Sequence, residues 1–232
     1  MSFKMTPDKI KLLVQNLEEK FRSHANIENG LAMSRYMKGH FPFYGIKSPE
    51  RVLLTKEWMK DVPADLSTEE RWELVTALWK KDQREFQYVA MDYLHGWKRN
   101  LIALEDIKKI EFLITHRSWW DTVDSVASNY LGKYFLKFPE QIEPTVTAWR
   151  KSNNLWLKRS CMLFQLKYRE KTDLELLKNL IRQFQPEKEF FIQKAIGWTL
   201  RQYSKTDPVP VRKFVDEIQL KGLAAKEATK YL

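Results

Sequence analysis

The chain has 232 residues, enough for one domain with a sizeable hydrophobic core. Only 7 glycines and 9 prolines interrupt long stretches of good helix formers, so the composition favours an all-α protein. The 40 Lys and Arg residues outnumber the 30 Asp and Glu residues, and the net charge of +10 predicts an anionic partner such as nucleic acid or a membrane surface. A basic solvated surface without a partner is the alternative.

Cysteine content and hydropathy indicate the compartment. Cys161 is the only cysteine, so no intrachain disulfide can form, and its neighbours suggest a packed helix face. Charges are spread over the first residues, and no apolar run reaches about 18 residues. We therefore expect a cytoplasmic protein that is neither secreted nor embedded in a membrane.

Helix starts are marked by capping residues along the chain. Those capping signals are Thr6-Pro7, Ser48-Pro49, Asp207-Pro208 and the capping box of Ser67 with Glu70. Between them, apolar residues recur at spacings of three and four, as expected for helices that bury one face. The predicted helices cover residues 7–22, 27–38, 49–60, 68–81, 83–97, 104–115, 119–131, 139–151, 154–169, 172–184, 187–203 and 208–219.

The loop from Gly39 to Ile46 is rich in turn residues and also unusually aromatic. Its rings Phe41, Phe43 and Tyr44 either pack the junction between neighbouring helical repeats or serve a surface role. The sequence leaves both interpretations open.

An internal period of about 35 residues runs through the second half of the chain. Aligning Leu155 with Phe190 matches apolar positions with apolar positions and Arg159 with Lys194. Each period is two helices long, as in HEAT-like repeats. We therefore predict an all-α superhelix, a solenoid of about six HEAT-like repeats, forming a single domain over residues 1–232.

One helix from each repeat would line the concave face of this solenoid, and we expect that face to be basic. The predicted inner helices contain Trp120, Arg159 and Trp198. Their cations, which suit contact with a phosphate backbone, are Lys158, Arg159, Lys194 and Arg201.

The sequence lacks the motifs of several enzyme classes. No Gly-rich phosphate loop or G-x-S-x-G elbow occurs, which argues against nucleotide hydrolysis and serine-hydrolase chemistry. The 4 histidines are scattered, and no His or Cys pair has metal-ligand spacing. We expect neither a metal nor a cofactor.

Residues 118–124 read S-W-W-D-T-V-D, with two acids beside two tryptophans. Ser118 is a candidate helix N-cap, and Asp121 would complete a weak capping box with it. Asp124 is not needed for that cap.

Asp124 follows Trp120 by four residues, so both side chains share one helix face. An ion pair between Asp124 and Arg117, or a lysine of the next repeat, is the structural alternative. A functional interpretation starts from chemistry: aromatic rings and a carboxylate attract a cation, while Lys and Arg bind phosphate.

DNA with a purine alkylated at N3 or N7 combines both features, because the damaged base is cationic. Cleavage of its glycosidic bond places positive charge on the sugar, which Asp124 could stabilise while it positions or deprotonates the attacking water.

Three separated segments carry a resemblance to a known family. They are M-K-G-H-F-P-F-Y-G-I-K-S-P-E-R (residues 37–51), S-W-W-D-T-V-D (118–124) and F-I-Q-K-A-I-G-W-T-L-R-Q-Y-S-K-T-D-P (191–208). They resemble those of the AlkD-type alkylpurine DNA glycosylases, bacterial DNA alkylation repair enzymes built from HEAT-like repeats. The similarity covers nearly the whole chain, and the segments match in the family's order and spacing.

The resemblance implies that Trp120 and Trp198 contact the sugar and backbone of the lesion nucleotide, that Asp124 is the catalytic carboxylate, and that Arg159 binds phosphate. It also implies hydrolysis of alkylated purines in double-stranded DNA without a metal, a nucleotide or a deep base pocket. We expect a monomer, since a groove that encloses a duplex needs no partner subunit.

Further candidate DNA contacts are Tyr36, Lys47 and Trp119. Lys47 stands where the family has glutamine, which puts the lesion-side contacts in question. Two other functions stay open: a non-catalytic helical-repeat protein that binds nucleic acid, and a HEAT-type scaffold for protein interactions.

Overall fold

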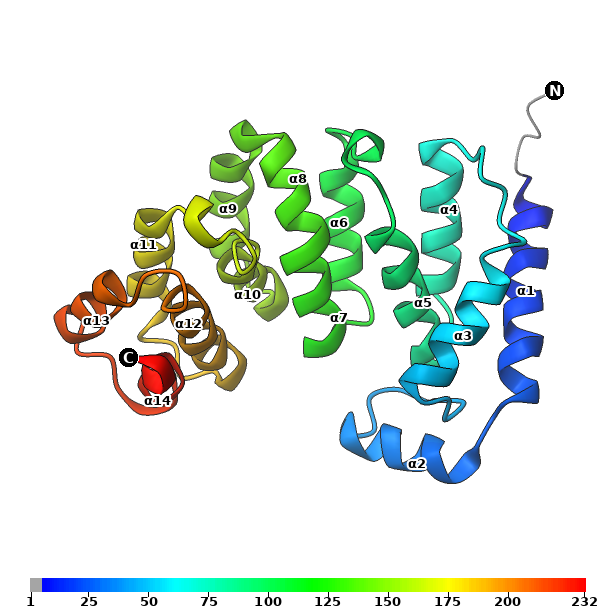
Figure 1. The fold of residues 1–232 in the computed structure, drawn as a ribbon, viewed down its shortest axis with the longest axis horizontal. Helices are drawn as coiled ribbons and strands as arrows, with labels where there is room; N and C mark the ends of the chain where they lie inside the picture. Colours follow the sequence, from blue (N-terminus) through cyan, green and yellow to red (C-terminus); the bar gives the residue numbers. More distant parts are fainter. Residues whose placement is uncertain (1–5) are drawn as a thin grey trace. The chain divides into compact units, whose positions relative to one another are not determined.

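A computed structural model describes residues 6–232 of the chain, and these residues form helices and connecting turns without a strand (Figure 1). The predicted all-α fold is confirmed. None of the helices in this described range is both long enough and apolar enough to cross a membrane. The chain divides into two compact units, Met1–Leu101 and Ile102–Leu232, which we describe in turn. The single domain over 1–232 stays a prediction.

The first unit consists of helices whose apolar stripes pack together. Its elements are α1 (Pro7–Ser23), α2 (Ile27–Tyr36), α3 (Ser48–Trp58), α4 (Thr68–Trp79), α5 (Arg84–His95) and a short 3-10 turn, η1 (Arg99–Leu101). Helix α1 packs against α3 and α4, and α4 packs against α5. Large rings such as Phe21, Trp58, Trp79 and Phe86 are fully buried and form this core.

Local capping explains where several of these helices begin. Thr6 accepts a hydrogen bond from the Lys9 amide, and Ser67 forms the predicted capping box with Glu70. The predicted cap at Ser48 is wrong by one residue, because Lys47 is the N-cap and Ser48 already belongs to α3. Proline then occupies the first turn, where its missing N–H is not needed.

The aromatic loop from Gly39 to Ile46 packs in part against α5. The guanidinium of Arg84 lies 3.8 Å from the ring centre of Phe41, and Tyr44 meets Phe86 edge to face. Phe43 lines an open apolar hollow beside α2. The packing interpretation therefore applies to Phe41 and Tyr44. Phe43 also meets a ring of α5, that of Tyr88, but it lines the surface hollow as well.

The second unit continues the helical pattern. Its elements are α6 (Asp106–Thr115), α7 (Trp120–Ser125), the π-helical segment η2 (Val126–Leu131), α8 (Gly132–Lys137), η3 (Pro139–Gln141), α9 (Ile142–Arg150), α10 (Leu155–Leu163), η4 (Arg169–Lys171), α11 (Leu174–Phe184), α12 (Phe190–Tyr203), α13 (Pro208–Glu217), α14 (Gly222–Ala228) and η5 (Thr229–Tyr231). Helix α10 contacts both α7 and α12, so the three helices predicted to be inner helices are neighbours (Figure 1).

Three features of this unit depart from the predicted helices. The helix expected at 154–169 ends at Leu163 and is followed by turns. The helix expected at 119–131 continues to Lys137 and contains a π-helical segment directly after α7. Helix α14 was not predicted, because an isolated helix of 7 residues is marginal in water. It is stabilised by packing on α12, where Ala224 and Ala228 are fully buried.

Candidate active site

The carboxylate of Asp124 is held at the contact between α7 and α10. Arg159 donates from Nε to Oδ1 over 2.7 Å and from Nη2 to Oδ2 over 2.8 Å, a two-pronged ion pair. The Asp124 side chain is 13% exposed and the Arg159 side chain 5%. The acid is therefore fixed in orientation but still reachable from solvent.

The same guanidinium also reaches α12. Its Nη1 donates to the carbonyl oxygen of Phe191, and its Cζ lies 5.8 Å from the centre of that ring. Trp119 and Trp156 pack against Phe191 at centroid distances of 5.2 and 5.1 Å. Arg159 thus connects all three inner helices beside an aromatic wall. Its predicted phosphate contact stays a prediction.

Burial and charge act in opposite directions on Asp124. Desolvation raises the pKa of its carboxyl group, and the hydrogen bonds and charge of Arg159 lower it. The net shift is upward. A carboxylate of this kind is a stronger proton acceptor than an exposed aspartate, while the guanidinium favours its ionised form.

The π-helical segment follows the acid directly. The Ser128 hydroxyl donates to the carbonyl oxygen of Asp124 over 2.7 Å, and the Asn129 side chain donates to the carbonyl of Ser125 over 2.9 Å. Such segments are frequent at functional sites. Sequence periodicity missed this one, since a widened turn still spaces buried residues about four apart, as an α-helix does.

The start of α7 differs from its predicted cap. The Ser118 hydroxyl donates to the carbonyl of Ile114 over 2.6 Å and thereby belongs to the end of α6. Trp119, with extended backbone, is the N-cap, and it makes no side-chain capping bond. The predicted capping box of Ser118 with Asp121 is therefore wrong.

The two candidate catalytic tryptophans lie on α7 and α12, two helices that both contact α10. Trp120 is the first residue of α7, half-buried and one turn before Asp124. Trp198 is half-buried on α12, seven residues after Phe191. Their contact with a sugar stays a prediction.

The predicted DNA-binding cations of the second unit have carboxylate partners. Lys158 pairs with Glu187 at 2.8 Å. Lys194 and Arg201 both pair with Glu227, at 2.9 and 2.6 Å. Glu227 lies on α14, so sequence reasoning missed this acid together with its helix. Nothing in the sequence distinguished Glu227 from the other acidic residues.

The remaining candidates belong to the first unit. Tyr36 ends α2 and is largely exposed, and Lys47 is exposed directly before α3. Both side chains are accessible to a large ligand.

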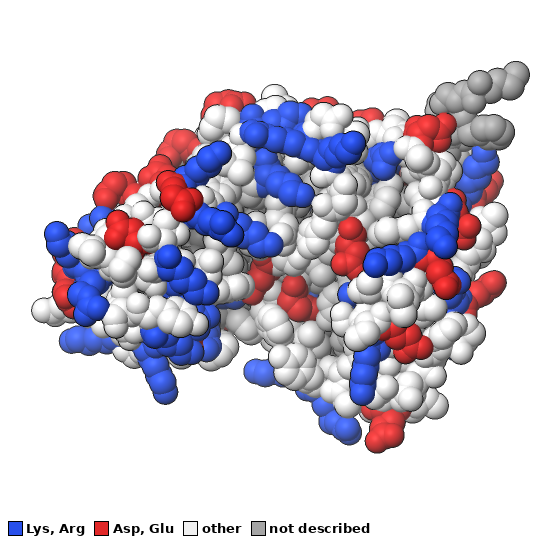
Figure 2. Space-filling view, in the orientation of Figure 1, with Lys and Arg blue, Asp and Glu red and all other residues white. Residues whose placement is uncertain are grey.

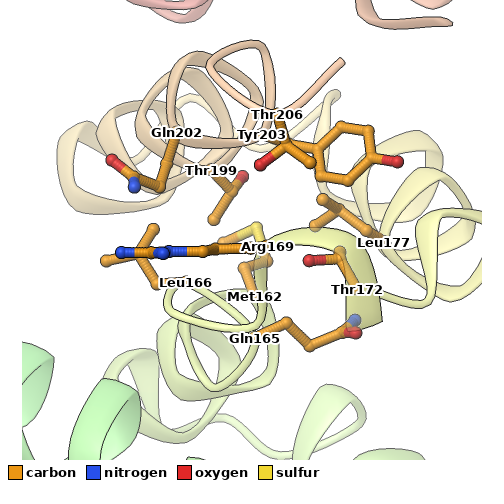
Figure 3. Close-up of a pocket in the computed structure, with 10 residues that line it drawn as sticks. All are labelled: Met162, Gln165, Leu166, Arg169, Thr172, Leu177, Thr199, Gln202, Tyr203 and Thr206. Carbon is orange, nitrogen blue, oxygen red and sulfur yellow. The ribbon is translucent and has the colours of Figure 1, made fainter.

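A separate small cavity lies between α10, α11 and α12 (Figure 3). Its volume of about 20 Å³ has room for roughly one water molecule. Gln165 in its wall exchanges two hydrogen bonds with the backbone of Asp173, and Thr199 donates to carbonyls of its own helix. The cavity is a polar seam between helices, and the accessible acid at Asp124 is the better candidate site.

Comparisons with known proteins identify the family of this chain. The family model for the DNA alkylation repair enzyme matches residues 17–232. A solved structure described as a "Predicted DNA alkylation repair enzyme from Enterococcus faecalis" is 36% identical, with a TM-score of 0.80, over 90% of this chain and 96% of that one.

A second structure, smu.31 from Streptococcus mutans UA159, shares the fold at 16% identity with a TM-score of 0.58, over 78% of this chain and 97% of that one. No curated protein matches the sequence. With a match over nearly its whole length, the chain belongs to the DNA alkylation repair enzyme family.

Proposed function

We propose that this chain is a monofunctional DNA glycosylase that releases N3- and N7-alkylated purines from duplex DNA by hydrolysis. Family membership supports the role in alkylation repair. The observation that carries the glycosylase chemistry is the accessible carboxylate of Asp124, held by both prongs of a buried arginine.

The proposed reaction needs little from the protein besides this acid. An alkylated purine is already cationic, so it leaves as a neutral base when it takes the electron pair of the glycosidic bond. Positive charge then develops on the deoxyribose, where a negative carboxylate stabilises it. Water adds to C1′ and gives up a proton, which Asp124 can accept, and an abasic site is the product.

Arg159 acts on this step through Asp124. A guanidinium fixes a carboxylate in one plane more firmly than an ammonium group does, because it donates two parallel hydrogen bonds. We therefore assign Arg159 a positioning role in addition to its predicted phosphate contact. The half-buried Trp120 and Trp198 would present their indole faces to the cationic sugar.

The other candidate contacts would hold the backbone of the duplex. They are Lys158, Lys194, Arg201, Tyr36, Lys47 and Trp119. Three of these cations already form ion pairs with acids of the protein: Lys158, Lys194 and Arg201. To bind a phosphate, each would have to share its cation with the acid or release the acid.

Asp124→Asn tests the proposal. The variant keeps one hydrogen-bond acceptor for Arg159 and removes the negative charge. We expect release of 7-methylguanine from alkylated duplex DNA to fall by at least about a hundredfold, as for loss of a general base or an electrostatic stabiliser. Duplex affinity should stay within a fewfold of that of the unchanged protein.

The matched control is Asp121→Asn, one turn earlier on α7, which should retain base release. Each assay is run with and without a chelator. Normal turnover by Asp124→Asn rejects the proposed chemistry. Salt-sensitive DNA binding without any base release by the unchanged protein would instead support a non-catalytic binder, and salt-insensitive binding a protein scaffold.

A further inference from the structure

Helix α14 approaches α12 at a residue that has no side chain. A Cβ atom built on Gly197 would lie 2.4 Å from the Cβ of Glu227 and 2.8 Å from the carbonyl oxygen of Ala224. Only glycine permits this approach, because those distances are far shorter than ordinary van der Waals contact. Glu227 is therefore seated directly over the bare backbone of α12.

Cations surround this carboxylate from both sides. On α12, Lys194 precedes Gly197 by three residues and Arg201 follows it by four, so each lies one helical turn away on the same face. Their nitrogen atoms lie 2.9 and 2.6 Å from the Glu227 oxygens, and Lys230 donates to both oxygens at 3.1 Å. We call Lys194, Arg201, Lys230 and Glu227 the α14 cluster.

The α14 cluster presents its positive charges outward. The Glu227 side chain is only 10% exposed, whereas Lys194, Arg201 and Lys230 are 38%, 24% and 46% exposed. Three positive charges and one negative charge leave a net charge of +2. Figure 2 shows Lys and Arg side chains gathered over α12 and α14. An anion arriving from solvent meets the cations before the acid.

The cations also retain hydrogen-bonding capacity. A guanidinium carries five N–H donors and an ammonium three, and Glu227 occupies only part of these in each partner. A single carboxylate that holds three long side chains lowers the entropy they would lose on binding a further anion. The arrangement is preorganised for an oxyanion.

We propose that the α14 cluster binds a phosphate of the DNA backbone, with Lys230 as a direct contact and Glu227 as a positioning residue that holds the cations. The inference rests on the proposed function in that it takes duplex DNA as the ligand. Trp198 lies on α12 between Lys194 and Arg201 in sequence, so a phosphate bound here lies within about a turn of the candidate sugar contact.

Salt-dependent binding of an undamaged duplex tests the direct contact. Lys230→Ala should weaken binding roughly three- to tenfold and reduce the slope of log affinity against log salt by about 1. Lys226→Ala is the matched control, because Lys226 is an exposed cation of α14 outside the cluster. It should change neither quantity appreciably. Equal effects of the two variants overturn the assignment of Lys230.

Glu227→Gln tests the positioning role, because the loss of a negative charge and the loss of ordered cations would change DNA affinity in opposite directions. Removing an acid beside DNA should tighten binding if only net charge matters. If Glu227 positions the cations, the carboxamide cannot hold all three and binding weakens by a fewfold. Equal or tighter binding by a variant that circular dichroism shows to be folded overturns the positioning role.

These measurements separate the two proposals. The assays on Lys230, Lys226 and Glu227 measure DNA binding and not base release. If the unchanged protein binds the duplex without releasing base, the glycosylase proposal is refuted, and the α14 cluster is still tested by the binding of its own variants. Complete loss of release in Asp124→Asn, together with unaltered binding by Lys230→Ala, refutes only the α14 cluster. An unchanged protein that does not bind duplex DNA refutes both.

Discussion

Replacing Arg159 by methionine keeps much of its buried apolar volume and removes both hydrogen bonds to Asp124, together with the bond to the carbonyl of Phe191. Breaking a buried ion pair from one side costs about 3–5 kcal/mol, because the remaining charge is left without compensation. The 13% exposure of Asp124 lets water solvate part of that charge. We therefore expect Arg159→Met to destabilise the protein by about 3 kcal/mol.

The same change should move the pH dependence of catalysis. Burial raises the pKa of Asp124 and Arg159 opposes the rise, so loss of the guanidinium raises that pKa further. In the proposed mechanism, base release requires the ionised carboxylate of Asp124. The acid limb of the rate profile should therefore shift to higher pH, and the rate lost at neutral pH should partly return as the pH increases.

Urea denaturation, monitored by circular dichroism, measures the stability of Arg159→Met, Asp124→Asn and the double variant. Single-turnover release of 7-methylguanine at a series of pH values measures the pH profile. The double variant should be more stable than the sum of the two costs predicts, by about 1–2 kcal/mol, since it leaves no buried charge unpaired. Additive costs together with an unmoved acid limb would refute the reasoning.

Three further predictions concern the packing of α14, the ion pairs of Glu227 and the cap of α4. In a thermal unfolding assay, Gly197→Ala should destabilise the protein by about 1–2 kcal/mol, because its methyl group must displace α14. In the control Gly96→Ala, the nearest neighbour of the new methyl group would be 3.4 Å away, and the change should stabilise the protein by about 0.5 kcal/mol. Equal effects of the two changes would contradict the close contact between α12 and α14. Hydrogen bonds from Lys194 and Lys230 lower the pKa of Glu227 from 4.5 to about 2. The stabilisation it contributes should be present above about pH 4.5 and fade as the pH falls towards 2, so the stability gap to Glu227→Gln should close over that window; a constant gap would exclude this linkage. Ser67→Ala removes a capping box and should cost about 1 kcal/mol in urea denaturation, and no measurable loss would count against that cap.

Much of the local structure could be predicted because its causes are local. Thr6 and Ser67 cap helices through bonds to backbone groups three residues away, and spacings of three and four identify the buried stripes. The placement of Trp120 and Asp124 one turn apart on α7 follows from the same geometry.

The start of α7 shows where local signals compete. Ser118 has the right chemistry for an N-cap, yet its hydroxyl bonds to the carbonyl of Ile114 at the end of the preceding helix. The π-helical segment after Asp124 and the extension to Lys137 likewise depend on how neighbouring helices pack.

By itself, the sequence determined the all-α fold, most helix starts, and the pairing of an aromatic residue with an acid on one helix face, since each depends on interactions within about one helical turn. Only the tertiary structure decided the partners of the charged groups. Arg159 meets Asp124 across 35 residues, and Lys194 and Arg201 meet Glu227 on a helix that is stable through packing. A charge in the sequence is the same whether paired or free, and the distance that decides between these states is set by how helices pack.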